Sequence, residues 1–162
     1  MVQGAEVNPS ERFDSLFQVY AAWDKTHEGK WFERTMPIDW LLLKRQAQAE
    51  SGLDPDAVSP VGAEGLTQFM AATFTEWMTK QFKGVPPPSK HINVFDPEDA
   101  IWAQADVMSW LLSVWKGDMR KALSSYNYGI GNVTRIVQAK GEAWESDLPA
   151  ETKAYLAKIL VP

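Results

Sequence analysis

The chain has 162 residues, of which 45% are hydrophobic and 23% charged, and it contains no cysteine. This length and composition predict one folded domain, and they exclude disulfides, thiolate metal sites and cysteine nucleophiles. Because the net charge is −5 and the pI is near 5.0, the average field does not attract nucleic acid, anionic lipid or an anionic wall polymer. Any contact with such a partner must be local.

The N-terminus carries no export or membrane signal that we recognise. It lacks a basic segment followed by an apolar run, so no secretory signal is predicted. The longest apolar stretches, such as residues 40–43, are far too short to span a bilayer. We therefore expect a soluble protein without membrane insertion.

The first half of the chain is predicted to be helical, with one long loop. Apolar residues recur at helical spacing over 11–25, which indicates an opening helix. Pro37 suits the first position of a second helix, and Gly52 is suited to end it. The pattern further predicts a loop over 52–65, a short helix over 66–70, a longer helix over 73–82 and an extended proline-rich connection over 84–94.

The second half begins with a strong helix start. Asp96 is a capping acid, Pro97 suits the first helical position, and Glu98 and Asp99 face the positive end of the helix dipole. Further helices are expected over 118–126, 132–140 and 149–159. Since no period-2 stretch is long enough for a confident strand, the predicted fold class is all-α, with a minor hairpin at most.

Glu50 stands where the second helix ends, directly after an apolar face. Burial there would partly desolvate the carboxyl group, raise its pKa and keep it protonated near neutral pH, as a general acid requires. By position alone, an ordinary solvated glutamate at a helix end is the more frequent interpretation.

Three sequence blocks favour the interpretation of Glu50 as a general acid. The pair Glu-Ser stands at 50–51, Ser-Pro-Val-Gly-Ala-Glu-Gly-Leu-Thr-Gln-Phe-Met at 59–70, and Ala-Leu-Ser-Ser-Tyr-Asn-Tyr-Gly-Ile-Gly at 122–131. A weaker block, Leu-Pro-Ala-Glu-Thr-Lys-Ala-Tyr, stands at 148–155. Together these blocks resemble the soluble lytic transglycosylase family, of lysozyme-like fold, and the resemblance extends over residues 38–160.

The resemblance implies a lytic transglycosylase catalytic domain over 1–162, with a helical extension at 1–36 and a core at 37–162. Glu50 would be the catalytic acid. The family cleaves the β-1,4 bond between N-acetylmuramic acid and N-acetylglucosamine in peptidoglycan without water, and it leaves a 1,6-anhydro ring on the muramyl end. The substrate's own N-acetyl group would stabilise the positive transition state. No cofactor is expected.

By resemblance, five further residues line the glycan-binding groove: Ser59, Gln68, Met70, Tyr126 and Asn127, with the Tyr126 hydroxyl close to the catalytic carboxyl. Amide and hydroxyl groups can hydrogen-bond sugar hydroxyls and N-acetyl groups. Methionine and tyrosine can pack on sugar faces, although singly they are more often core residues. Ser51 is expected to orient the loop.

Two other functions remain open from the residues. A lysozyme-type hydrolase of the same bond would need a carboxylate about 6.5 to 9.5 Å from Glu50 to activate water. Asp54, Asp56 and Glu64 are weak candidates, since acids beside Pro55 commonly make turns. The second alternative is a non-catalytic glycan-binding or assembly module, which the intact Glu50 argues against.

Other conspicuous residues are interpreted as structural. Trp102 and Trp110 flank the apolar stripe of the long helix and Trp115 continues it, so most tryptophans are predicted to be core. His27 and His91 have no partner at ligand spacing, and no metal site is predicted.

The sequence departs from the family pattern at three positions. Ala71 replaces a frequent proline, Tyr128 a common alanine and Lys153 a frequent arginine. None of these changes touches the acid, but Tyr128 could alter a sugar subsite and so the preferred substrate length.

The cellular setting is open. A wall enzyme without a signal is what a bacteriophage would use, either released through a holin into the periplasm or carried in a virion. A bacterial enzyme whose leader had been removed would look the same.

Overall fold

The fold was analysed in a computed structural model, which describes residues 8–25, 30–83 and 86–160. The α-helices are α1 (Asp14–Ala22), α2 (Trp40–Ser51), α3 (Ala71–Gln81), α4 (Pro97–Val114), α5 (Met119–Tyr128), α6 (Ile130–Lys140) and α7 (Ala150–Ile159). Short 3-10 helices lie at Pro9–Glu11 and Gly141–Asp147. The strands are β1 (Trp23–Lys25), β2 (Trp31–Glu33), β3 (Ala63–Glu64) and β4 (Phe69–Met70).

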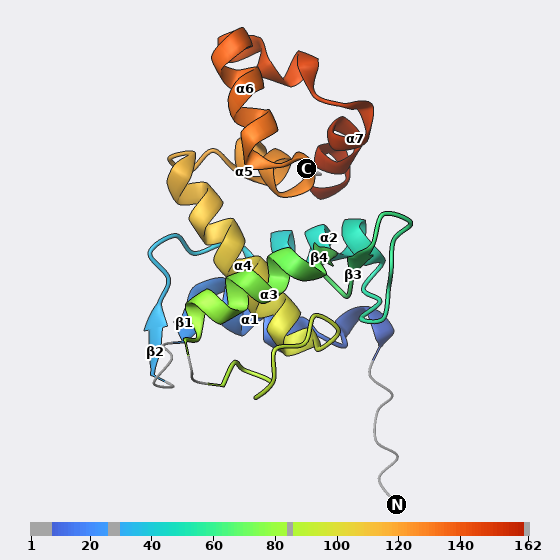
Figure 1. The fold of residues 1–162 in the computed structure, drawn as a ribbon, viewed down its shortest axis with the longest axis vertical. Helices are drawn as coiled ribbons and strands as arrows, with labels where there is room; N and C mark the ends of the chain where they lie inside the picture. Colours follow the sequence, from blue (N-terminus) through green and yellow to red (C-terminus); the bar gives the residue numbers. More distant parts are fainter. Residues whose placement is uncertain (1–7, 26–29, 84–85, 161–162) are drawn as a thin grey trace, which may run out of the picture.

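The helices form a body and an upper part. The body holds α1, α2, α3 and the two hairpins; α5, α6 and α7 lie together above it, and α4 runs from the body towards them (Figure 1). Helix α4 packs against α1 and α5, and α2 packs against α1 and α7. The first half of α4 is buried on all sides, with Ala100, Ile101, Ala103 and Ala105 fully inaccessible to solvent. The predicted predominantly helical class is confirmed.

Helix α2 begins later than predicted, since Pro37 was expected at its first position and the helix starts at Trp40. Asp39 is its N-cap, and the Asp39 carboxylate accepts a hydrogen bond from the Leu41 amide at 3.1 Å. Pro37 therefore lies outside the helix. The predicted end is confirmed, because Gly52 adopts a left-handed conformation with φ of 68°. Glu50 is thereby fixed in the last turn of α2.

The predicted short helix at 66–70 is wrong. The backbone turns with positive φ at Gly65 and again at Gln68, which no helix tolerates. Strand β4 then pairs antiparallel with β3, Ala63 opposite Met70 and Glu64 opposite Phe69. At Gly65 a Cβ atom would lie 2.2 Å from the Val94 carbonyl oxygen, so only glycine fits.

The opening helix is shorter than predicted. It ends at Ala22, and β1 then pairs with β2, Trp23 opposite Glu33. Helix α4 begins as predicted, with Asp96 accepting from the Glu98 amide at 2.8 Å. The other predicted helices exist with ends shifted by a few residues.

The proline-rich connection is tied to α4. The described part, from residue 86 onward, contains turns, and the buried Asp99 carboxylate accepts hydrogen bonds from the amides of Ser89 and Asn93. Residues 84–85 of the predicted connection lie outside the described part. Among the described helices, none is long and apolar enough to cross a membrane.

Candidate active site

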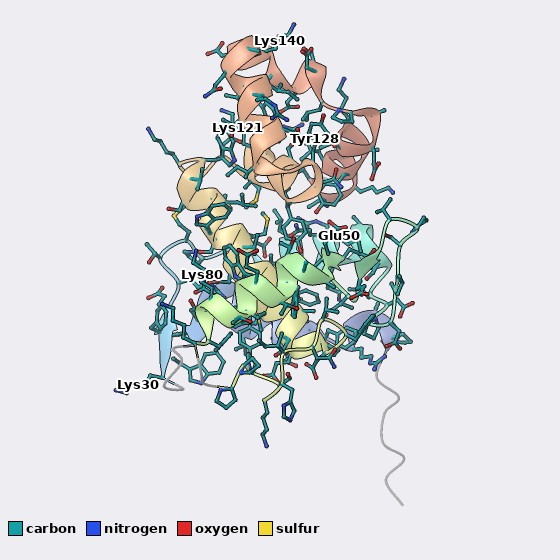
Figure 2. All side chains as sticks on the ribbon, in the orientation of Figure 1. Lys30, Glu50, Lys80, Lys121, Tyr128 and Lys140 are labelled. Carbon is teal, nitrogen blue, oxygen red and sulfur yellow. The ribbon has the colours of Figure 1, made fainter. Side chains whose placement is uncertain are left out.

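A groove of about 760 Å³ runs between the body and the upper part of the molecule. Glu50 lies at this boundary, at the end of α2, with Tyr128 above it (Figure 2). The groove brings together all six residues that the sequence singled out: Glu50, Ser59, Gln68, Met70, Tyr126 and Asn127. The three sequence blocks therefore meet in space although they are far apart in the chain.

The Glu50 carboxyl group is half-buried in this groove. Desolvation raises its pKa from the usual 4.5 to about 7, and the negative charge of Glu151 adds to the increase. A hydrogen bond with the Tyr155 side chain acts in the opposite direction and lowers the pKa. A substantial fraction of Glu50 is therefore protonated near neutral pH, as a general acid requires.

Tyr155 is held by a buried chain of amide groups. The Gln46 Nε2 donates to the Tyr155 hydroxyl oxygen at 3.0 Å, and the Gln104 Nε2 donates to the Gln46 Oε1 at 3.0 Å. Gln46 and Gln104 are fully buried. Because Gln46 supplies the donor to the phenol oxygen, the phenol proton is free to point at the Glu50 carboxylate.

Tyr126 lies near Glu50 but does not bind it through its hydroxyl. That hydroxyl donates to the Thr67 carbonyl at 2.9 Å, and the ring packs edge-on against Phe69. Desolvation raises the pKa of Tyr126 well above 10, and the charge of Glu50 adds to this. Tyr155, rather than Tyr126, supplies the hydroxyl that contacts the acid.

Side-chain hydrogen bonds fix the loop between α2 and β4. The Ser51 hydroxyl donates to the Leu66 carbonyl at 2.7 Å, so Ser51 orients the loop as predicted. The Ser59 hydroxyl oxygen accepts from the Ala63 amide at 3.0 Å, and the Gln68 Nε2 donates to the Gly65 carbonyl at 2.9 Å. Ser59 and Gln68 thus shape the wall that they line.

Met70 and Asn127 line the groove from opposite walls. The Met70 side chain, at the end of β4, is 47% exposed and is therefore not a core residue. The Asn127 Oδ1 accepts from the Thr152 hydroxyl at 2.9 Å, which ties α5 to α7. The amide of Asn127 is thus held in one orientation.

The three acids proposed as second carboxylates are not at the groove. The Asp54 Oδ1 accepts from the Asp56 amide at 2.9 Å, a turn within the loop. Among the described residues that line the groove, Glu151 is the carboxylate besides Glu50. Sequence reasoning missed Glu151 and Tyr155 as site residues, although both stand in the weak block at 148–155.

The prediction that most tryptophans are core fails at Trp110. Trp40, Trp77 and Trp115 are partly buried and pack against the core. Trp102 and Trp144 are buried, but Trp110 is 44% exposed and lines the groove together with Trp77. Trp110 lies on the flank of α4 that α3 covers only in part, and the spacing of apolar residues alone does not reveal how much is covered.

Tyr128 lines the groove as well. The replacement of the family's common alanine by Tyr128 therefore falls within the candidate site.

Within residues 8–25, 30–83 and 86–160, no group of three or more histidine, cysteine or acidic side chains is arranged to hold a metal ion. His91 is exposed in the proline-rich connection. His27 lies outside the described residues.

Comparison with known proteins identifies relatives of this chain. Over 134 residues the chain is 29% identical to the membrane-bound lytic murein transglycosylase D of Escherichia coli, covering 79% of this chain and 28% of that protein. It is 30% identical over 126 residues to the peptidoglycan transglycosylase gp16 of Escherichia phage T7, covering 76% of this chain and 9% of that protein. The chain thus spans about a quarter or less of these relatives.

Solved structures share the fold. The 70 kDa soluble lytic transglycosylase of Escherichia coli matches 92% of this chain and 23% of its own with a TM-score of 0.69 and 25% identity. An inactive mutant of the lytic transglycosylase Slt from Pseudomonas aeruginosa, with a glutamate changed to glutamine, matches 75% of this chain and 20% of its own, with a TM-score of 0.64 and 27% identity. These neighbours confirm the predicted lysozyme-like helical fold.

The family assignment rests on the greater part of the chain. The family model described as the Transglycosylase SLT domain matches residues 32–148. This range contains the first three sequence blocks, with Glu50 and the other five predicted site residues. The chain belongs to the SLT transglycosylase domain family.

Proposed function

We propose that this chain is a peptidoglycan lytic transglycosylase that cleaves the bond between N-acetylmuramic acid and N-acetylglucosamine and forms 1,6-anhydro-N-acetylmuramic acid. The observation that carries the proposal is the Glu50 carboxyl group, half-buried in a groove, with a pKa raised to about 7. Its support is the family membership and the inactive glutamate-to-glutamine mutant of a structural neighbour.

In the first step Glu50 acts as a general acid. Its proton passes to the glycosidic oxygen as the bond from that oxygen to C1 of the muramyl sugar breaks. The N-acetyl group of the same sugar stabilises the positive charge that develops at C1. A groove that already favours the neutral carboxyl makes this proton available at neutral pH.

In the second step the Glu50 carboxylate acts as a base. It takes the proton from the C6 hydroxyl of the muramyl sugar while the C6 oxygen bonds to C1. The 1,6-anhydro ring closes, Glu50 regains its proton, and no water is consumed. The Tyr155 hydroxyl stabilises the carboxylate between the two steps, because it can donate a hydrogen bond to it.

The remaining site residues are proposed to bind the glycan. Gln68 and Asn127 each use one end of the amide within the protein, Nε2 and Oδ1 respectively, so the opposite ends are assigned to sugar hydroxyl and N-acetyl groups. Met70 offers an exposed apolar contact to a sugar face. Ser59 and Tyr126 complete the walls.

A lysozyme-type hydrolase is the second candidate, because Glu151 lines the groove and acts electrostatically on Glu50. A hydrolase would need this carboxylate to activate water. We assign Glu151 a different role: its negative charge helps to keep Glu50 protonated. The products of the reaction distinguish the two, as described in the Discussion.

The domain and its setting are also proposals. We assign residues 1–162 to one catalytic domain, with an N-terminal extension at 1–36 and a core at 37–162. In its described part the extension is not purely helical, since it contains the hairpin of β1 and β2, and α1 packs against α2 and α4. The similarity to a phage T7 peptidoglycan transglycosylase supports a phage-encoded enzyme, either released with the help of a holin or carried in the virion. In either setting the substrate is the peptidoglycan of the cell wall.

The proposal is tested by the solubilisation of purified sacculi. The parent protein should release soluble fragments, and Glu50→Gln should reduce the rate by at least about a hundredfold, since general acid–base catalysis contributes about 10² to 10⁴. Glu142→Gln, an exposed glutamate outside the groove, is the matched control and should retain the parent rate. Equal, measurable rates for Glu50→Gln and the parent would exclude Glu50 as the acid. No solubilisation by the parent would leave only a glycan-binding module.

A further inference from the structure

A second cavity adjoins the groove. It has a volume of about 370 Å³ and lies between α3, α4, the strands β1 and β2 and the segment that follows β2. Trp77 and Trp110 line both cavities. Both volumes fall in the range of pockets that bind small molecules. Trp77 and Trp110 therefore stand at the junction of the groove and the second cavity.

The two tryptophans form a platform at the junction. Their ring centroids are 5.7 Å apart and the planes are inclined at 58°. Trp110 is 44% exposed, which leaves a large apolar surface in water. An exposed aromatic ring next to a ligand groove offers an apolar face on which the apolar face of a sugar ring can be buried.

Hydrogen bonds to buried or partly buried side chains hold the Trp77 ring of this platform in place. The Trp77 Nε1 donates to the Asp106 Oδ2 at 3.0 Å, and the Asp106 Oδ1 accepts from the Arg34 Nη1 at 3.1 Å. Arg34 is 4% exposed, and its Nε donates to the Tyr20 carbonyl at 2.7 Å. Trp77 therefore has one orientation, and Trp110 packs on a rigid partner. Such preorganisation lowers the entropic cost of binding.

The second cavity is lined by both charged and uncharged polar side chains. The charged ones pair with one another, because Arg34 forms ion pairs with Asp24 at 3.6 Å and with Asp106 at 3.1 Å. Thr35, Gln81 and Ser113 line this cavity and are exposed. Hydroxyl and amide groups can both donate to and accept from sugar hydroxyls. An aromatic face combined with such groups suits a neutral sugar.

We propose that the second cavity is a distal subsite that binds one further sugar of the glycan strand, stacked on Trp110. This inference rests on the proposed function, because it takes the strand to lie in the groove. The distal subsite makes binding depend on strand length: a strand that reaches Trp110 gains affinity, and a shorter one does not. Trp110 is thus a specificity residue at a distance from the reacting bond.

The test measures the affinity of Glu50→Gln, in which turnover is blocked, for peptide-free glycan strands from the disaccharide to the octasaccharide. Affinity should rise with length up to a plateau. Adding Trp110→Ala should remove the last gain, about tenfold in Kd, and leave the shortest strands unaffected. Trp110→Phe should restore most of the gain. Val114→Ala is the matched control, since Val114 is equally exposed on α4 and lines neither cavity.

Two results would overturn the distal subsite. These are an unchanged length dependence in Trp110→Ala, or an equal loss of affinity for strands of every length. If Glu50→Gln binds no strand at all, the groove is not a glycan site and the proposed function fails as well. If the parent solubilises sacculi but Trp110→Ala binds like its background, only the distal subsite is wrong.

Discussion

The Tyr155 side chain is hydrogen-bonded to the Glu50 carboxyl group, while the Tyr155 oxygen accepts from Gln46 at 3.0 Å. These two contacts orient the tyrosine proton towards the acid. Because a hydrogen bond to the charged form stabilises it, Tyr155 opposes the desolvation that raises the pKa of Glu50. Desolvation raises the pKa of Glu50 and the hydrogen bond with Tyr155 lowers it, and the resulting pKa is about 7.

Tyr155→Phe should raise the pKa of Glu50 further, because the carboxylate loses its donor. The alkaline limb of the pH–rate profile should then move to higher pH. The kcat should fall by roughly tenfold, with a smaller change in KM, since the carboxyl also loses its fixed position. Rates on purified peptidoglycan between about pH 5 and 9 measure both effects.

Tyr20→Phe is the matched control for this experiment. The Tyr20 hydroxyl also donates to a glutamate, Glu98, at 2.7 Å, but Tyr20 is outside the groove. Its loss should leave the shape of the pH–rate profile unchanged. An unshifted profile in Tyr155→Phe would show that the contact with Glu50 does not tune the acid.

Glu151→Gln should move the alkaline limb in the opposite direction. Removal of the neighbouring negative charge makes the Glu50 carboxylate easier to form, so the pKa of Glu50 falls and the protonated acid is lost at lower pH. The anhydro product should still form. A loss of all activity, as complete as in Glu50→Gln, would instead assign Glu151 a direct chemical role.

Glu50 should also make folding pH-dependent. Its pKa is about 7 in the folded state against 4.5 ordinarily, so the folded protein binds more protons between these values. The contribution to stability is complete below about pH 4.5 and is lost as the pH rises through about 7. At about 1.4 kcal/mol per pH unit, the loss is on the order of 3 kcal/mol.

Glu50→Gln, which is neutral at every pH, should therefore be more stable than the parent at pH 8, and this difference should disappear at pH 4. Denaturant unfolding at both pH values measures it. Glu142→Gln, at an exposed glutamate outside the groove, is the control for the substitution itself. A Glu50→Gln protein that is no more stable at pH 8 would contradict a raised pKa.

Gly65→Ala should destabilise the loop that carries Ser59 and Gln68. The position has φ of 76°, and a Cβ atom would meet the Val94 carbonyl oxygen at 2.2 Å. We expect a loss of about 2–4 kcal/mol, the sum of backbone strain and displaced packing. Gly117→Ala has a similar φ of 87° but open space around it, and should lose only about 1 kcal/mol. If Gly65→Ala and Gly117→Ala lost the same free energy of unfolding, the close contact with the Val94 carbonyl oxygen would not contribute to the loss.

The parts of the fold that depend on local rules were predictable from sequence. Asp96 and Pro97 specify the start of α4, and Gly52 specifies the end of α2. The hairpin of β3 and β4 was not predictable, because it depends on the left-handed backbone conformation of Gln68. Glutamine rarely adopts this conformation.

The candidate site was predictable where motifs were specific. All six residues drawn from the sequence blocks line one groove. The pairing of Tyr155 with Glu50 was missed, because it joins α7 to α2 through tertiary packing. Trp110 was misassigned for a related reason: periodicity shows which face of a helix is apolar, but not how much of that face a neighbouring helix covers.

The most direct test of the lytic transglycosylase assignment is mass spectrometry of the muropeptides that this protein releases from purified peptidoglycan. We predict fragments that end in 1,6-anhydro-N-acetylmuramic acid, formed by the parent protein and absent with Glu50→Gln. Fragments with reducing ends, each heavier by one water, would contradict the assignment and identify a hydrolase, with Glu151 as the carboxylate that activates water.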